Sequence, residues 1–496
     1  MKRIFAIVLG LALVLSMVTA AFAEERPTLR VAYPGNQHAF LEGEDENNNH
    51  IIRYIEENTG IDVEWILLPV EDSRGKLNLM MAAQEVDVVF YGDFQTLLDY
   101  NTEGLLLDMA PYIDDAGFAE DTLALTKECT FGETFAIFYP GGQSDTTVVW
   151  MYNKPLLDAA GIEVPEDLTL DQWTEILYKI QEAYPDKIPL AAAGQTSSSN
   201  LMLKGMDNIY AAYGIANTTR VTDDGSLEFT ATTDDMRQCL EFIAKLYADG
   251  ILDPEYLVST LDTLVPKIVN EQIVSINAEW YDFTGTYMPY MADEDGEVRD
   301  WVQVPIIIGT RETTGQTLGN RHRQLGAITA QCQNVEAAMK LLAFMSTDEY
   351  YYRIMYGEEG VDSVKNEDGT YTLLDTPLAK AYSTNGTLFH NYYSVKESKE
   401  LRCMRLRGTY ASEDLFNVNI MNFYAPKEVA DPIRVHPYTP EYDDILSDLM
   451  DTIAVYSAKI LTGEYDISAF DDMVAELDGW GLAEGLEALN DWYTAG

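Results

Sequence analysis

Aromatic and carboxylate side chains follow one of the predicted strands of this chain. Residues 273–278 have the apolar character of a strand, and Trp280, Tyr281 and Asp282 come directly after it. Flat rings pack against the apolar CH faces of a sugar, and a carboxylate accepts hydrogen bonds from its hydroxyl groups. The group therefore has the chemistry to bind a carbohydrate. The alternative for Trp280 is an ordinary place in a hydrophobic core.

A second polar and aromatic group follows two predicted strands near the amino terminus. In an open parallel sheet, ligands bind beyond the carboxyl ends of the strands, where these loops begin. For the acid of this group, the alternative is to cap the helix that starts near residue 95. The candidate residues in the two loops are Asn36, Gln37, His38, Tyr91, Asp93 and Phe94.

Two tyrosines and one arginine complete the candidate ligand-binding residues. Tyr139 and Tyr152 flank a Pro-Gly-Gly segment, where each can face a ligand or pack in a core. Arg323 belongs to a short cationic cluster at 321–323, and three more arginines lie between 402 and 407. Such groups can bind a uronate, sulfate or phosphate through paired hydrogen bonds, although many instead pair with neighbouring acids.

The elements that must position these residues alternate between strand and helix. This alternation predicts a parallel sheet with right-handed crossover helices. Gly60 is placed to end the first helix with a left-handed residue. The predicted strands are 29–33, 61–67 and 86–90, and the helices are 50–59, 76–84 and 95–103.

A second α/β section follows residue 142. Thr169 and Gln172 form a capping box before a helix, and Thr233 or Asp234 can cap another. A nearly all-apolar helix at 334–345 is predicted to be buried, and the last 60 or so residues are predicted to be helical. Further strands are predicted at 148–152, 273–278 and 302–308.

Composition excludes several classes of protein. The chain has 496 residues with 82 acidic against 32 basic side chains, giving a formal net charge of -50. This charge disfavours binding to nucleic acid or to anionic lipid. A hydrophobic content of 47% is too high for a disordered acidic tail.

The amino terminus has the pattern of a secretory signal. Lys2 and Arg3 precede an apolar run at 4–18, and Ala21-Phe22-Ala23 follows it, which predicts cleavage after Ala23. A retained anchor is the alternative, but a spanning helix needs about 20 apolar residues. No cysteine lies beside the cleavage site, so lipid attachment is not expected there.

The cysteines are too widely spaced for a metal site. They contain no C-x-x-C, which disfavours structural zinc and favours isolated buried thiols. One long-range disulfide stays open in an exported protein. We expect neither a cofactor nor a bound metal. The cysteines are Cys129, Cys239, Cys332 and Cys403.

Several segments, taken in order, resemble the extracellular solute-binding proteins of carbohydrate ABC transporters, in their large maltose-binding-protein-like form (family 1). Residues 150–154 end in Y-N-K, 160–165 read A-G-I-E-V-P before Trp173, and 356–362 read Y-G-E-E-G-V-D. The other matching segments are 88–93 with 103–109, 139–142, and 460–463 with 466–468.

The resemblance implies an α/β fold of the two-lobed periplasmic-binding-protein type (type II). Each lobe would be a mainly parallel sheet flanked by helices, with a hinge between the lobes and extra carboxyl-terminal helices. The chain crossings imply an amino-terminal lobe of 24–147 plus about 303–358, and a carboxyl-terminal lobe of 148–302 plus about 359–496. The sugar would bind between the lobes, with Trp280 stacked on it.

The resemblance also implies a non-catalytic, monomeric protein that delivers its sugar to the permease subunits of an ABC importer. The chain departs from the family in two ways. Residues 184–189 have too few oxygen donors for the calcium loop found in related chains, so no calcium is expected there. The lipidated cysteine of many relatives is also missing.

Two other functions stay open on the sequence. A secreted glycoside hydrolase would also combine aromatic rings with paired carboxylates, but G-x-S-x-G, H-E-x-x-H and P-loop motifs are absent. A binder of peptides or metals is the other alternative. Five histidines and no close cysteine pairs disfavour metal capture.

Overall fold

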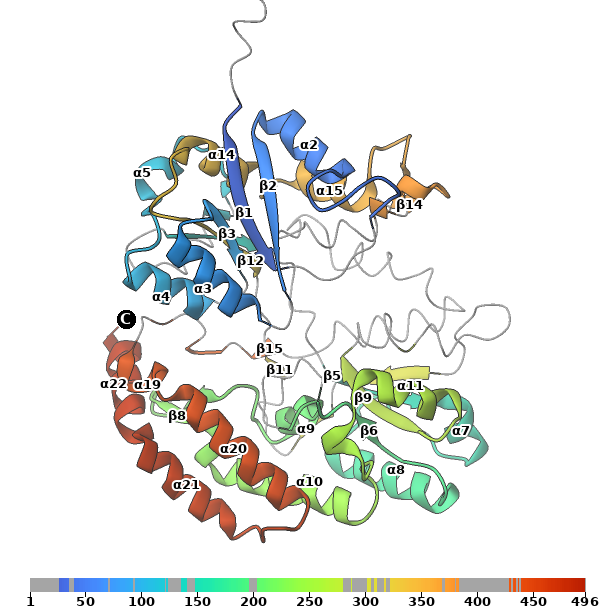
Figure 1. Ribbon diagram of the computed structural model, residues 1–496. Coiled ribbons are helices and arrows are strands. Elements are labelled where there is room, and N and C mark those ends of the chain that lie inside the picture. The colour runs from blue at the N-terminus through green and yellow to red at the C-terminus, as the bar shows by residue number, and fades with distance from the viewer. Residues whose placement is uncertain are drawn as a thin grey trace, which may run out of the picture. The chain divides into compact units, whose positions relative to one another are not determined.

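The structure is a computed structural model in which the chain forms two compact units (Figure 1). The first unit comprises the described residues within 26–140, 322–365 and 371–382, and the second comprises the other described residues. The structure describes residues 26–34, 40–69, 72–91, 94–120, 122–123, 135–140, 148–195, 203–279, 287, 301–304, 307–309, 316–317, 322–367, 371–379, 381–382, 428–429, 431–433, 436 and 439–495.

The units differ from the predicted lobes at their boundaries. The chain leaves the first unit after Pro140 and returns to it at His322, whereas the sequence placed the return near residue 303. Trp301–Val304 (β10) pairs with Val148–Asn153 (β5) of the second unit, and this pairing keeps the segment there.

The first unit is built on a five-stranded sheet with the order β2-β1-β3-β12-β4. Strands β1 and β2 pair in parallel along their whole lengths, and β3 pairs in parallel with β1. Strand β12 runs antiparallel to both β3 and β4. The bounds are β1 Thr28–Pro34, β2 Asp62–Leu68, β3 Val88–Tyr91, β4 Ala136–Pro140 and β12 His322–Ile328.

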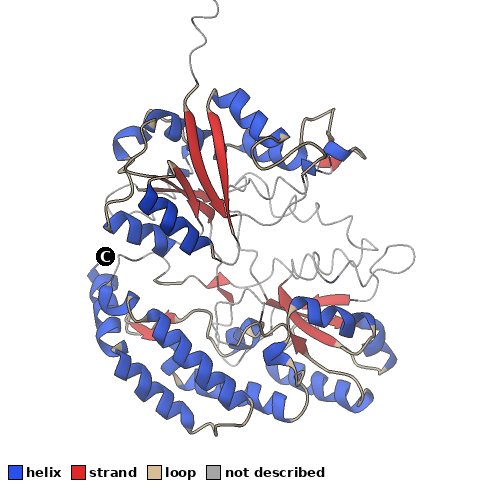
Figure 2. Cartoon of the chain, viewed as in Figure 1, coloured by secondary structure: helices blue, strands red, loops and turns tan. Residues whose placement is uncertain are grey.

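Helices cover the sheet of the first unit (Figure 2). Apolar residues of α2 and α14 form one hydrophobic core with Val31, Val63 and Phe90 of the strands. Asn49 caps α2 by accepting bonds from two backbone amides, and Gly60 ends it at φ 70°, as predicted. The bounds are α2 His50–Thr59, α3 Ser73–Ala83, α4 Phe94–Thr102, α5 Ala110–Ile113, α14 Val335–Met345 and α15 Asp348–Tyr356, with the hairpin β13 Ser363–Lys365 and β14 Tyr371–Leu373.

A charged pair ties β1 to the start of β3. The Arg30 guanidinium donates to both carboxylate oxygens of Asp87 at 2.8 and 2.9 Å, and the Arg30 backbone N–H donates to the same carboxylate at 2.9 Å. Burial raises the pKa of Asp87, but the hydrogen bonds from Arg30 outweigh burial and leave that pKa below its usual range. The ionised form of Asp87 therefore stabilises the fold.

We expect Asp87→Asn to lower the free energy of unfolding by about 2 kcal/mol at neutral pH, because it removes a charge-assisted bidentate pair. A lowered folded-state pKa contributes stability above the unfolded pKa, and this is lost as pH falls through the folded value. The variant should therefore lose less stability than the wild type below about pH 4. Urea titrations across pH measure both effects.

Asp99→Asn is the matched control, because Asp99 pairs with Arg74 at 2.9 Å on the surface. It should change the free energy of unfolding by less than about 1 kcal/mol. If the free energy of unfolding fell equally with decreasing pH in Asp87→Asn and in the wild type, the stabilising role of the Asp87 carboxylate would be contradicted.

The second unit contains a four-stranded sheet with the order β10-β5-β9-β6. Strand β5 runs antiparallel to β10 and β9, while β6 is parallel to β9. The bounds are β6 Ala191–Ala192 and β9 Ser275–Glu279, with the two-stranded pairs β7 Thr219–Val221 and β8 Leu227–Phe229, and β11 Gln316–Thr317 and β15 Glu428–Val429.

The carboxyl-terminal helices extend the core of the second unit. Helix α20 packs against α10, α21 packs against α20, and α22 contacts β8. The predicted capping box of Thr169 and Gln172 starts α8, and Thr233 caps α10. The bounds are α7 Lys154–Ala159, α8 Leu170–Ala183, α9 Asp207–Ala212, α10 Asp234–Ala248, α11 Leu261–Val269, α19 Pro440–Asp443, α20 Leu446–Leu461, α21 Ala469–Trp480 and α22 Leu482–Ala495, with η1 Thr230–Thr232 and η2 Tyr256–Val258.

The predicted fold class, two α/β lobes with extra carboxyl-terminal helices, is confirmed, with one refinement of the sheets. Among the described strands, each main sheet has one member that runs against the others, β12 in the first unit and β5 in the second. Each of these is the first described strand of its main sheet after the chain enters that unit from the other. The sheets are therefore mixed, although most of their strands point the same way.

Candidate functional site

The carboxyl edge of the first sheet collects the predicted residues of that unit. Strands β1, β2 and β3 are parallel, so the segments that follow Pro34, Leu68 and Tyr91 all leave the sheet at this edge. The antiparallel strand β12 begins at the same edge, where His322 pairs with Pro140 at the end of β4. The ends of β1, β2, β3 and β4 and the start of β12 thus meet along one edge, although they are far apart in the sequence.

Tyr91 is the best-defined candidate at this edge. It is 8% exposed, and its hydroxyl lies 3.0 Å from the Ser73 hydroxyl in the first turn of α3. Side chains alternate along a strand, so Tyr91 points away from the face that carries Phe90. Tyr91 therefore lies on the α3 side of this edge.

Three other candidates are placed at this edge by their backbone. Tyr139 lies in β4 one residue before its end, and Arg323 lies in β12 two residues before Leu325, which pairs with Tyr91. Phe94 begins α4 shortly after β3. Four remaining candidates of the first unit lie outside the described residues: Asn36, Gln37, His38 and Asp93.

The corresponding edge of the second sheet carries the exit of β9. Glu279 ends β9 opposite Val148 at the start of β5, and β6 ends beside Asn277. Trp280, Tyr281 and Asp282 follow in sequence and lie outside the described residues. The chain therefore leaves β6 and β9 at one edge of this sheet.

Tyr152 does not join the exit of β9. It pairs with Ser275 and Val302, four residues along β5 from Val148 and therefore about 13 Å away along the sheet. Its ring lies 5.0 Å from that of Trp150 within the core, and burial raises its pKa to about 12. The structure thus favours the core alternative for Tyr152, because β5 runs antiparallel to β9.

The tryptophans in the described part of the chain leave few open aromatic surfaces. Trp65, Trp150, Trp173 and Trp301 are all buried. Trp480, at the end of α21, is 45% exposed and donates to the Thr452 hydroxyl at 3.1 Å, and Trp492 in α22 is partly buried. None of the four buried indoles offers a face to a ligand.

The sequence analysis missed a buried amide pair beside the exit of β9. Asn208 in α9 and Asn277 in β9 are each 1% exposed and donate to each other at 3.0 and 3.1 Å. The available signal was an asparagine within the mostly apolar segment 273–278. A buried amide in such a segment needs a hydrogen-bond partner elsewhere in the fold.

A lysine holds the loop in which no calcium was expected. Lys187 donates to the backbone oxygen of Glu271 at 2.5 Å, and Ile188 N–H donates to Gln272 O at 2.7 Å. The ammonium lies where the loop after α8 meets the loop after α11. Within the described residues, no group of three or more histidine, cysteine or acidic side chains is arranged to hold a metal ion.

We expect EDTA to leave the melting temperature unchanged, because a fixed ammonium disfavours a divalent cation in the same loop. Lys187→Ala should lower the melting temperature, since it removes the donor to Glu271. Differential scanning calorimetry with and without EDTA measures both effects. A fall of several degrees on chelation would show that a bound metal stabilises the protein.

No helix in the described residues is both long and apolar enough to cross a membrane. The described cysteines, Cys239 and Cys332, are free and buried. Cys129, Cys403 and the predicted signal segment lie outside the described residues.

Comparison with known proteins identifies relatives along most of the chain. A family model for the bacterial extracellular solute-binding proteins matches residues 48–352, which is more than half of the chain. The fructooligosaccharide ABC transporter substrate-binding protein FusA of Streptococcus pneumoniae is 22% identical over 253 residues. That match spans 46% of this chain and 46% of FusA, so it covers about half of each protein.

Solved structures share the fold over nearly the whole chain. FusA of S. pneumoniae in complex with kestose has a TM-score of 0.69 at 16% identity, covering 94% of this chain and 99% of that one. An HMO-binding solute-binding protein associated with an ABC transporter, from Bifidobacterium longum infantis, has a TM-score of 0.66 at 15% identity. The second match covers 95% of this chain and 99% of that one.

Proposed function

This chain belongs to the bacterial extracellular solute-binding proteins, and from that premise we propose that it captures an oligosaccharide for an ABC importer. The proposed ligand-binding residues lie in or beside segments that follow strands of each main sheet. The first edge would contribute Asp93 and the loop 36–38, and the second would contribute Trp280 with Asp282.

The observation that carries this proposal is the convergence of strand ends at one edge of the first sheet. The ends of β1, β3 and β4 and the start of β12 lie along that edge. Ligands of open α/β sheets bind beyond such an edge. The residues that leave it combine amides, a carboxylate and aromatic rings, which suits a ligand with many hydroxyl groups.

The relatives support carbohydrate over other solutes. FusA is named for fructooligosaccharide transport and its structure holds kestose, and another relative of the same fold is described as HMO-binding. We therefore propose an oligosaccharide as the ligand of this chain.

We propose that the protein is a monomer without catalytic activity and that it passes its ligand to permease subunits. The family description places its members outside the cell. We further propose that residues 1–23 are a signal cleaved after Ala23 and that no lipid is attached there. The proposed ligand-binding residues are Asn36, Gln37, His38, Tyr91, Asp93, Phe94, Tyr139, Trp280, Tyr281, Asp282 and Arg323.

A ligand panel tests the function. The mature protein should show a rise in melting temperature with one class of oligosaccharide, because a ligand that binds only the folded state stabilises it by mass action. The panel would contain kestose, nystose, human milk oligosaccharides, mannose-rich glycans, uronate oligomers and a mixed peptide control. Calorimetry on the best ligand gives its Kd and stoichiometry.

The outcomes separate the alternatives. Saturable sugar binding without release of reducing sugar supports a transport protein. Cleavage of the bound oligosaccharide would instead favour a hydrolase, and stabilisation by peptides alone would contradict the proposed ligand class.

A further inference from the structure

The buried amide pair of Asn208 and Asn277 lies beside the exit of a strand that leads to the proposed ligand-binding residues. Asn277 is the third residue of β9, two positions before its end at Glu279. Asn208 is in the first turn of α9, which follows the segment leaving β6. The pair therefore connects β9 to α9, the next described helix after β6 in the chain.

Each amide of the pair donates to the other, so both hydrogen bonds form only when α9 and β9 are aligned in one way. The Asn208 amide donates to Asn277 Oδ1 at 3.0 Å, and the Asn277 amide donates back to Asn208 Oδ1 at 3.1 Å. Asn208 Oδ1 also accepts from the Ile209 backbone N–H at 2.9 Å, and Asn277 Nδ2 lies 3.8 Å from Met206 Sδ. A shift of α9 along β9 would break both amide bonds in a buried position, where an unpaired amide is costly.

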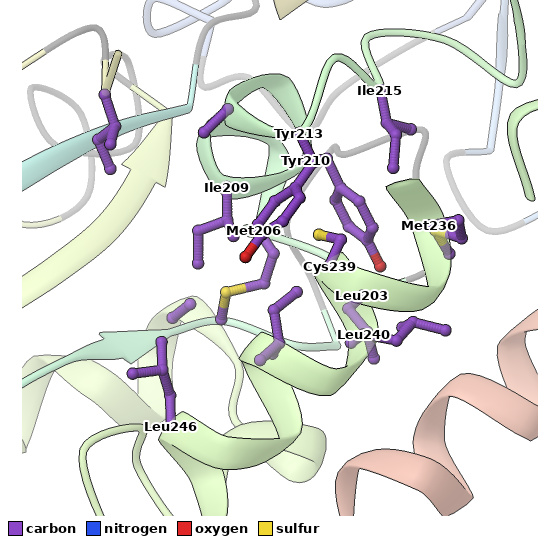
Figure 3. Packing of buried hydrophobic residues seen from close by; sticks show 14 of the residues in the cluster. Leu203, Met206, Ile209, Tyr210, Tyr213, Ile215, Met236, Cys239, Leu240 and Leu246 are labelled. Atoms are coloured by element: carbon purple, nitrogen blue, oxygen red, sulfur yellow. The ribbon is translucent and has the colours of Figure 1, made fainter. Parts of the chain in front are cut away.

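Contacts with α10 and with the 307–309 segment also hold α9 in place. Figure 3 shows Tyr210 and Tyr213 beside Cys239 of α10, and Tyr210 is completely buried. At the end of α9, a Cβ on Gly309 would lie 1.6 Å from the Ala212 backbone oxygen, so the 307–309 segment passes directly against the helix. Because α9 is fixed against α10 and this segment, the amide pair fixes β9 relative to a rigid element.

We propose that Asn208 and Asn277 are positioning residues for the ligand, acting by fixing the alignment of β9 with α9. The inference rests on the proposed function. An apolar pair of similar size would fill the same space, but it would not specify how α9 and β9 align. Apolar packing alone tolerates small sliding movements, whereas two reciprocal hydrogen bonds do not.

The test uses the mature protein and the double variant Asn208→Leu/Asn277→Leu. Replacing both partners by apolar groups avoids an unpaired amide, so the melting temperature should stay within a few degrees of the wild type. The affinity for the oligosaccharide that the wild type binds best in the panel, tested first with kestose, should fall about tenfold or more. Calorimetry gives the affinity, and thermal unfolding gives the stability.

Ser275→Ala is the matched control. Ser275 is on the same strand and the same face as Asn277, is completely buried, and donates to Pro189 O at 2.6 Å. It lies at the end of β9 far from the exit. This variant should lose stability and keep the wild-type affinity, which separates positioning from general support of the fold.

A double-mutant cycle tests whether the amide pair and Trp280 are energetically coupled. In a Trp280→Phe background, the double leucine change should weaken binding by a smaller factor than in the wild type, because both changes act on the same segment. If the double leucine change weakened binding by the same factor in both backgrounds, the amide pair would not be coupled to Trp280, and this would contradict the inference.

Wild-type affinity in a folded double variant would overturn the inference and leave the proposed function intact. If the double variant does not fold, Asn208→Ala is compared with Ser275→Ala. Weaker binding by Asn208→Ala alone supports the positioning role, and equal binding by both overturns it. Failure of the wild type to bind any sugar would instead refute the proposed function.

Discussion

Trp280→Ala is expected to weaken oligosaccharide binding by about 30-fold or more, because truncating an aromatic anchor at the centre of a binding site costs roughly 2–4 kcal/mol and each 1.4 kcal/mol is about tenfold in Kd. Trp280 follows β9, which ends at the edge of the sheet beside β6 and β5. An indole placed there can stack on the CH face of a sugar ring, and alanine offers no such surface. Isothermal titration calorimetry with the wild-type ligand measures the loss.

Trp480→Ala is the control for this prediction. Trp480 is 45% exposed at the end of α21 in the carboxyl-terminal helices. Its removal should leave the affinity unchanged. If the Trp280→Ala protein were folded and retained the wild-type Kd, Trp280 would not be the stacking residue, and the remaining aromatic candidates would be Tyr281, Phe94 and Tyr139.

Trp173→Ala is expected to destabilise the second unit by about 3–5 kcal/mol, the usual cost of replacing a fully buried tryptophan. Trp173 has no exposed surface and lies edge-to-face with Trp150 at 6.2 Å. It joins α8 to β5 in the largest hydrophobic cluster of the described residues. The melting temperature of the corresponding calorimetric transition should fall by about 10 °C.

The two compact units have separate hydrophobic cores, so the effect of Trp173→Ala should be confined mainly to the second unit. A transition that belongs to the first unit should move less than one that belongs to the second. Trp480→Ala again supplies the control, since an exposed side chain leaves a smaller cavity. A shift of only one or two degrees for Trp173→Ala would mean that the core around α8 closes over the missing ring.

Local sequence signals predicted the individual elements accurately where capping chemistry was explicit. Helix α2 was predicted at 50–59 and is observed at His50–Thr59, because Asn49 and Gly60 fix its two ends. The capping box of Thr169 and Gln172 is observed at the start of α8. Such signals work because the partners are within four residues and their hydrogen bonds depend only on local backbone geometry.

Strand exits predicted which loops of the first unit lie together, but they did not predict the place of Tyr152. The alternation of elements predicted that β1 and β3 are parallel and that their exits lie together, and the register confirms this. The same reasoning could not assign Tyr152 to the core, because that depends on β5 running antiparallel to β9. Strand direction after a crossing between units is set by distant partners.

By itself, the sequence determined the α/β class, the helix ends, the exported character expected from its amino terminus, and the aromatic and acidic residue types available for a sugar. Only the tertiary structure decided which strand ends share an edge, that Tyr152 is in the core, and that Asn208 meets Asn277 across 69 positions of the chain. The physical reason is the range of the interactions. Caps and periodicity are local, whereas strand register and buried amide pairing arise only when remote segments exclude water together.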